Sequence, residues 1–255
     1  PVLVLVAYLF TDFDLSIFKD KILWLVGGLN AIGLFLQNAG MTSTSATNAV
    51  LLIDINVVFV AILAALILKE KITKFTILGL LIGLFGVFFV TTGGNLNGLT
   101  DGSLTGNLLV LSAGVVWAFY IVYQKKFVDR RVEPYMTSAA VVTTAAITSI
   151  PIALIFGTLG PLDTAGGLSL IYLAVFCTGG AWLLYIMGLK GRGATDSSVI
   201  LLLEIVFAMI FAVIILGEMP GWPTAIGAVL IIVSIILVNV RPNGGKDTCE
   251  GPKVT

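Results

Sequence analysis

The chain has 255 residues, of which 58% are hydrophobic and only 11% charged, and its mean hydropathy is +1.09. A soluble domain carries about 25% charged residues, so this composition excludes a water-soluble globular protein and makes the lipid bilayer the expected surroundings. The net charge is zero, which indicates no nucleic-acid partner, and the absence of histidine excludes imidazole metal ligands and histidine-based catalysis. The two cysteines, Cys177 in an apolar run and Cys249 in a polar tail, do not suggest a disulfide framework.

The opening segment, residues 1–10 (PVLVLVAYLF), is apolar but too short to cross a bilayer. We expect it to be the end of a helix that begins upstream. A signal peptide is the weaker alternative, because no basic segment precedes the apolar run.

Eight further stretches have the length and apolar character of membrane-spanning helices, which need about 20 residues. They are residues 22–41, 46–68, 75–92, 104–124, 135–156, 167–189, 194–217 and 222–240. A β-barrel would need strands of about 10 residues with alternating polarity, and no such alternation occurs. The fold class is therefore expected to be an all-α membrane protein.

One stretch occurs twice: residues 46–70 match residues 194–218 without a gap, since 194 minus 46 and 218 minus 70 both equal 148. The matches include an Ala-Thr start, a Val-Phe pair and a closing Glu, and they indicate an internal repeat. If the second repeat begins at residue 104, the first begins near 104 minus 148, or −44. This arithmetic predicts that about 45 residues precede the chain.

Lysine and arginine alternate between the connections, and all fourteen of them fall on one side of the predicted bundle. The positive-inside rule makes that side cytoplasmic, which places the C-terminus in the cytoplasm and the protein in the plasma membrane. Residues 46–70 then run inward and residues 194–218 run outward. Inverted repeats of this kind are typical of secondary transporters.

These observations predict four parts. Residues 1–92 form a first repeat without its N-terminal portion, 93–103 an external linker, 104–240 a second repeat, and 241–255 a cytoplasmic tail. The linker is rich in glycine and asparagine, as flexible joints are.

The second copy contains Leu203-Glu204-Ile205-Val206-Phe207-Ala208 and ends in Leu216-Gly217-Glu218. These segments resemble the Leu-Glu-Pro-Val-Phe-Ala and Leu-Gly-Glu motifs of the EamA domain, in the drug/metabolite transporter superfamily. The resemblance implies ten helices in two inverted five-helix repeats that move small metabolites. The motif's proline is replaced by Val57 in the first copy and Ile205 in the second, which leaves a hinge at this depth in question.

Glu204 is the first candidate for the transport pathway, because an ionisable side chain near mid-membrane is expensive unless it faces a cavity or a partner. It either binds substrate or a proton, or it is protonated and hydrogen-bonded to a neighbouring helix. Its repeat counterpart is Asn56 (204 minus 148). Asp54 has only Leu202 as counterpart, and we expect it to assist proton coupling or to pair with a group upstream of the chain.

Two further helices supply polar and aromatic candidates. Gln37 and Tyr185 are repeat counterparts (185 minus 37 is 148) and either line a shared pathway or form interhelical hydrogen bonds. Trp117 and Tyr120 lie one turn apart and either stack on a substrate or pack the core.

Two features at the helix ends and faces have structural interpretations. Glu70, between Lys69 and Lys71, predicts an ion pair or a loop contact. Gly79 and Gly83, four residues apart, favour close helix packing, either within the protomer or across a homodimer.

The sequence predicts a secondary active transporter that moves a small metabolite, such as an amino acid, an amine or a related solute, by alternating access. Export is the expected direction. We expect no enzyme, no cofactor and no metal; no nucleotide-binding loop is present. A membrane channel or a non-transporting structural subunit is the alternative.

Overall fold

The computed structural model describes residues 4, 8–9, 11, 14–95, 102–131, 133–157, 163–217 and 219–239. Within these ranges the chain is helical, with no strand beyond one isolated bridge between Thr44 and Gly102. Glu218, the tail and most of the opening segment lie outside the described residues.

Among the described residues, eight helical spans are long and apolar enough to cross a membrane. They are Lys21–Met41, Ala46–Leu68, Lys74–Thr92, Leu104–Val128, Pro134–Phe156, Gly166–Leu189, Ala194–Ile215 and Trp222–Asn239. The eight predicted spans and the all-α fold class are therefore confirmed, with ends that differ by a few residues.

Five of the spans are single α-helices. These are α2 (Lys21–Met41), α5 (Lys74–Thr92), α6 (Leu104–Val128), α7 (Pro134–Phe156) and α12 (Trp222–Asn239). A short 3₁₀ turn, η1 (Leu15–Lys19), precedes α2. Side-chain oxygens cap several first turns; Asp20 accepts from Ile22 N, and Glu133 accepts from Tyr135 N and Met136 N. Such caps satisfy backbone N–H groups that have no partner within the helix.

The other three spans are interrupted. The second consists of α3 (Ala46–Asp54), α4 (Asn56–Leu63) and the π-helical η2 (Ala64–Leu68). The sixth consists of α8 (Thr164–Tyr172), the π-helical η4 (Leu173–Gly180) and α9 (Ala181–Leu189). The seventh consists of α10 (Ala194–Leu201), α11 (Leu203–Phe211) and the π-helical η5 (Ala212–Leu216).

The second and seventh spans share their irregularities. The π-helical ends match residue for residue, since 212 minus 64 and 216 minus 68 both equal 148. Each is followed by a residue in the left-handed conformation, Lys69 at φ 59 and Gly217 at φ 68. The sequence repeat thus extends to local backbone structure, while the inverted arrangement of the two halves stays a prediction.

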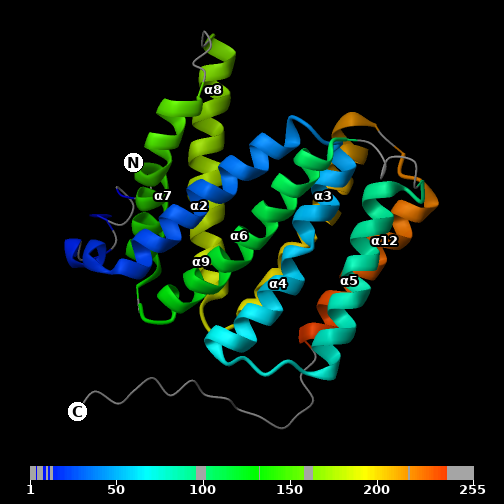
Figure 1. Cartoon of the computed structure of the whole chain (residues 1–255), viewed down its shortest axis with the longest axis horizontal. Coiled ribbons are helices and arrows are strands. Elements are labelled where there is room, and N and C mark those ends of the chain that lie inside the picture. The colour runs from blue at the N-terminus through cyan, green and yellow to red at the C-terminus, as the bar shows by residue number, and fades with distance from the viewer. Residues whose placement is uncertain are drawn as a thin grey trace.

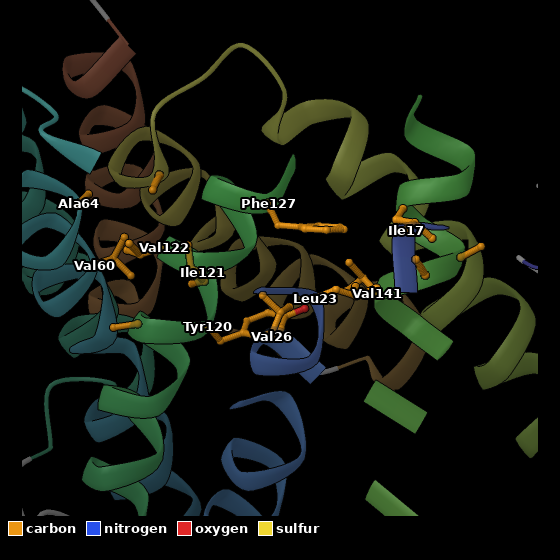
Figure 2. Packing of buried hydrophobic residues seen from close by; sticks show 14 of the residues in the cluster. Ile17, Leu23, Val26, Val60, Ala64, Tyr120, Ile121, Val122, Phe127 and Val141 are labelled. Carbon is orange, nitrogen blue, oxygen red and sulfur yellow. The ribbon is translucent and has the colours of Figure 1, made fainter. Parts of the chain in front are cut away.

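Among the described residues, the helices pack around two large apolar cores and one small cluster of Val128, Ile186 and Leu189. Figure 1 shows α2 beside α6 and α7, and α5 beside α12 at the opposite side of the molecule. One core lies among α2, α4, α6 and α7 and includes Leu23, Val26, Tyr120 and Phe127 (Figure 2). The other lies among α4, α5, α10, α11 and α12 and includes Val57, Val87 and Ile231.

Glycines allow α5 and α12 to approach closely. A Cβ on Gly79 would lie 2.4 Å from Val238 Cγ2, and one on Gly86 would lie 2.8 Å from the Gly227 carbonyl oxygen. Ser234 Oγ also donates to the Gly79 carbonyl at 2.6 Å. Of the two alternatives for the glycine face, packing within the protomer is therefore the one observed.

Candidate functional site

Four aromatic side chains form a continuous row between α6 and α9, which we call the aromatic cluster: Trp117, Tyr120, Trp182 and Tyr185. The ring centroids of Trp117 and Tyr120 are 5.3 Å apart in an edge-to-face arrangement. Tyr120 and Trp182 are 6.1 Å apart, and Trp182 and Tyr185 are 5.7 Å apart. The structure thus brings together three residues predicted for the pathway, and it adds Trp182.

The aromatic cluster contains buried polar atoms that lack protein partners. The hydroxyls of Tyr120 and Tyr185, the indole nitrogen of Trp182 and both amide atoms of Gln124 have no hydrogen bond in the part of the chain that the structure describes. Asn30, Gln124 and Trp182 surround the Tyr120 hydroxyl without forming a hydrogen bond of standard geometry with it. Leaving a buried donor or acceptor unpaired costs about 1–3 kcal/mol, so native structures do so rarely. This group of neighbouring polar atoms would suit a solute with hydrogen-bonding groups.

Gln37 connects to this region through Trp117. The Trp117 indole nitrogen donates to Gln37 Oε1 at 3.0 Å, which joins α6 to α2. Gly33 leaves room for this indole, because a Cβ there would lie 3.2 Å from Trp117 Cε2. Of the two alternatives for Gln37, the interhelical hydrogen bond is therefore observed, and it lies at the edge of the aromatic cluster; lining of a pathway stays a prediction.

Asp54 and Glu204, which we call the carboxyl pair, lie at the interruptions of the second and seventh spans. The two carboxyl groups are within electrostatic range of each other, although their repeat positions gave no reason to expect this. Asp54 is half-buried, and its Oδ2 has no hydrogen-bond partner among the described residues, whereas the Glu204 side chain is exposed. Asn56, half-buried, opens α4 directly after the interruption.

The interruptions themselves occur without the proline of the family motif. Hydrogen bonds of three-residue spacing replace the regular ones, from Val58 N to the Ile55 carbonyl and from Ile205 N to the Leu202 carbonyl. Such tightened turns within a helix often mark hinges. The helices are therefore irregular at this depth, although Val57 and Ile205 stand where the family motif has proline.

The carboxyl pair and the aromatic cluster belong to different parts of the bundle. Trp117, Tyr120 and Trp182 contribute to the core around α2 and α6, while Val57, Leu202 and Val206 beside the interruptions belong to the core around α5 and α12. The predicted pathway residues therefore form two groups rather than one.

A separate cavity of about 500 Å³ lies between α3, α5 and α6. Its lining is Asn48, Leu51, Leu52, Ile55, Leu84, Val87, Phe88 and Asn107. Only two of these eight residues are polar, so the lining suits an acyl chain or an apolar solute better than a polar metabolite. It contains no residue that the sequence predicted for the pathway.

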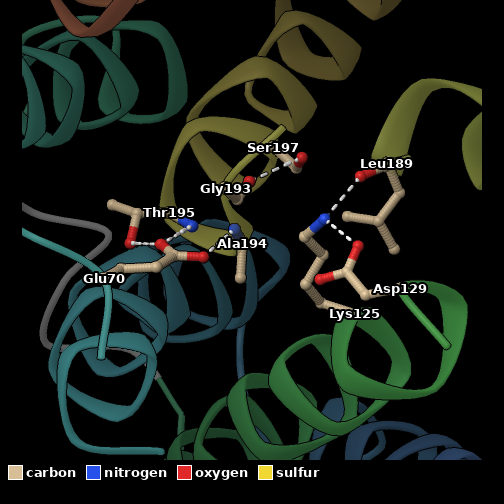
Figure 3. A network of polar contacts seen from close by, with 8 residues as sticks. All are labelled: Glu70, Lys125, Asp129, Leu189, Gly193, Ala194, Thr195 and Ser197. Atoms are coloured by element: carbon tan, nitrogen blue, oxygen red, sulfur yellow. Dashed lines mark hydrogen bonds and ion pairs between the residues drawn. The ribbon is translucent and has the colours of Figure 1, made fainter. Parts of the chain in front are cut away.

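Glu70 contacts the first turn of α10, a partner that the sequence did not predict. Its Oε1 accepts from Ala194 N at 2.6 Å, and its Oε2 accepts from Thr195 Oγ1 at 3.0 Å and Thr195 N at 3.3 Å (Figure 3). The predicted loop contact is thus a cap on the first turn of α10, a helix 124 residues further along the chain. The repeated closing Glu was the available signal, but sequence spacing says nothing about which helix end it reaches.

No group of three or more Cys, Asp or Glu residues that could hold a metal ion occurs among the described ranges. The titratable groups of the site are the carboxyl pair and the two tyrosines of the aromatic cluster. Its remaining polar atoms are amide and indole groups, which bind solutes through hydrogen bonds rather than by proton exchange.

Comparison with known proteins places these features in a family. The profile of the EamA-like transporter family matches residues 2–92 and 104–240. An uncharacterized transporter of Archaeoglobus fulgidus is 28% identical over 209 residues, which cover 80% of this chain and 71% of that protein. The uncharacterized transporter YyaM of Bacillus subtilis is 29% identical over 226 residues, which cover 86% of this chain and 73% of that protein.

A solved structure, described only as the crystal structure of a protein, superimposes with a TM-score of 0.78 over 93% of this chain and 82% of its own. At 18% identity this likeness concerns the fold alone. The family match spans most of the sequence and agrees with the eight apolar helices. The chain is therefore a multi-pass membrane protein that belongs to the EamA-like transporter family.

Proposed function

We propose that this membrane transporter is a secondary carrier that moves a small metabolite by alternating access, with the aromatic cluster as its substrate site. The observation that carries the proposal is the set of buried, unpaired polar atoms on Tyr120, Gln124, Trp182 and Tyr185. A bound solute with hydrogen-bonding groups would satisfy them.

The chemistry of the aromatic cluster favours an amine or an amino acid. Indole and phenol ring faces attract ammonium groups by about 0.5–2 kcal/mol each, more when water is excluded. The amide of Gln124 offers both donors and an acceptor, and its residue is fully buried. An ammonium group on the rings and a polar group on the amide would use both features.

The carboxyl pair would couple solute transport to proton movement. Discontinuous membrane helices place polar groups and freed backbone carbonyls at mid-membrane, where coupling ions bind. Asp54 and Glu204 lie at two such interruptions. Proton uptake there would be linked to movement of the interrupted spans. The proposed direction is export across the plasma membrane, with the C-terminus cytoplasmic, and we assign no enzymatic reaction.

The test is counterflow in liposomes that contain the complete protein. Vesicles preloaded with an unlabelled amine or amino acid should accumulate the labelled solute transiently, which a channel cannot cause. Gln124→Leu should raise KM at least roughly tenfold, because it removes both amide atoms. Ser112→Ala is the matched control, since the exposed Ser112 bonds only to the Leu108 carbonyl of its own helix. Flux without counterflow would favour the channel alternative, and no flux across the panel would favour a structural subunit.

A further inference from the structure

The connection between α9 and α10, residues 190–193, is held at both ends by charged side chains from other elements (Figure 3). At its α10 end, Glu70 accepts the three hydrogen bonds from Ala194 and Thr195 described above. Glu70 follows η2 and so belongs to the connection after the second span. A carboxylate at a helix N-terminus is also favoured by the helix dipole.

At the α9 end of the connection, the charged side chain is a cation. Lys125 of α6 donates from Nζ to the carbonyl oxygen of Leu189, the last residue of α9, at 3.1 Å. A cation at a helix C-terminus satisfies a carbonyl that has no partner within the helix and complements the dipole. Lys125 is only 5% exposed, and its charge is balanced by Asp129 at 2.5 Å.

The backbone at Gly193 and Ser197 accommodates the contacts of Glu70 with α10. A Cβ on Gly193 would lie 3.0 Å from Glu70 Oε2, so glycine leaves the space that the carboxylate occupies. Ser197 Oγ donates back to the Gly193 carbonyl at 2.9 Å, which reinforces the first turn of α10.

The span that ends at this connection is mostly exposed outside its last turn, where Ile186 and Leu189 pack against Val128 of α6. Within the most apolar 18-residue stretch of Gly166–Leu189, only 11% of the residues are buried inside the molecule, compared with 44% for Leu104–Val128. Contacts at its ends therefore have a large share in setting its position. Exchanging a hydrogen bond for one to water has a small net cost, provided that the freed groups, including the buried Lys125 Nζ, reach water when the helix ends part.

We propose that Glu70 and Lys125 form a latch that holds the predicted cytoplasmic ends of α9 and α10 against α6 and the end of η2, and that this latch opens to admit solute from that side. It rests on the alternating-access function proposed above. Release breaks these polar contacts and also parts Ile186 and Leu189 of α9 from Val128 of α6, while most of the two larger cores stays intact.

The test measures access to Ser198, which is fully buried one turn into α10. The complete protein carries Ser198→Cys with every native cysteine replaced by serine, in vesicles of known orientation. A membrane-impermeant maleimide is applied to either face. Glu70→Gln and Lys125→Met should each raise the labelling rate from the lysine-rich face by roughly tenfold and leave the rate from the other face unchanged. Thr195→Ala removes one of the three donors to Glu70 and should raise the rate less.

Two controls match these variants. Glu133→Gln alters a carboxylate on the same side that caps only its own helix, and Lys126→Met alters the neighbouring lysine. Both should label at the parent rate. Parent-like labelling of Glu70→Gln and Lys125→Met, or an equal rise from both faces, would overturn the latch. If those two variants do not fold, an unchanged rate in Thr195→Ala overturns it.

The outcome separates the latch from the proposed function. Increased one-sided labelling without counterflow would retain the latch as a conformational contact and refute the carrier. Counterflow with unchanged labelling would retain the carrier and refute the latch.

Discussion

Trp117 donates a hydrogen bond from its indole nitrogen to Gln37 Oε1 at 3.0 Å, and this bond joins α6 to α2 at the edge of the aromatic cluster. It holds one end of the row of rings in place while the other end, at Tyr185, keeps an unpaired hydroxyl. One end of the proposed site is thus held by a hydrogen bond, and the other end contains an unpaired hydroxyl. Substitutions at the two ends should therefore have different effects on stability and on solute binding.

At the hydrogen-bonded end, Gln37→Leu should lower the free energy of unfolding by about 1–3 kcal/mol, because it leaves the partly buried indole N–H without an acceptor. Thermal unfolding of the purified protein in detergent measures the loss. Asn38→Ala is the matched control, since the exposed Asn38 bonds only to the Leu34 carbonyl within α2. Equal stability of Gln37→Leu and the parent would contradict a supporting role.

At the end with the unpaired hydroxyl, Tyr185→Phe should leave stability unchanged or raise it by up to about 1–3 kcal/mol, because it removes a buried hydroxyl that has no partner among the described residues. The same change should raise KM for the transported solute if that hydroxyl binds it. Unfolding and counterflow are measured on one preparation. Tyr123→Phe, whose ring stacks on Phe119 rather than on a ring of the aromatic cluster, serves as the control. A lower stability with an unchanged KM would show that Tyr185 is a packing residue.

For the carboxyl pair, Glu204→Gln and Asp54→Asn should each abolish or alter the pH dependence of transport, since an amide cannot exchange a proton. The measurement is the initial rate of uptake between pH 5 and 9 with and without an imposed proton gradient. Glu133→Gln should keep the parent profile. Parent-like flux at every pH in both variants would remove the carboxyl pair from the coupling mechanism.

In the α5–α12 interface, Gly86→Ala should destabilise the protein by about 1–3 kcal/mol, because its Cβ would meet the Gly227 carbonyl at 2.8 Å in a packed interior. Gly28→Ala in α2 adds the same methyl group where nothing lies within 4 Å. It should be neutral or slightly stabilising, since alanine favours a helix by about 1 kcal/mol over glycine. Unfolding midpoints of the two variants, compared directly, separate the clash from helix propensity.

Several features could be read from local residues alone. The eight spans, the all-α class and the family followed from apolar length and from the motif around Glu204, because crossing a bilayer imposes a minimum run of apolar residues on any helix. The offset of 148 residues identified the repeated stretch, and its two copies share π-helical ends in the structure, since a repeated sequence repeats its local backbone preferences.

Pairings between distant helices were decided by tertiary packing. The contact of Glu70 with α10 spans 124 residues, and the approach of Asp54 to Glu204 spans 150 (204 minus 54). Repeat arithmetic compares equivalent positions, whereas these residues are not equivalent. It therefore raised the weight of Asn56 and lowered that of Asp54, while the structure brings Asp54 within electrostatic range of Glu204.

The sequence alone determined which residues lie in the membrane, because hydrophobic burial depends on the residues of one segment at a time. Tertiary structure alone decided which polar groups are satisfied, since a hydrogen bond requires two atoms within about 3 Å whatever their separation along the chain. Trp182 and Gln124 entered the candidate site only on that basis, as neighbours of Tyr120 whose polar atoms the fold leaves unpaired.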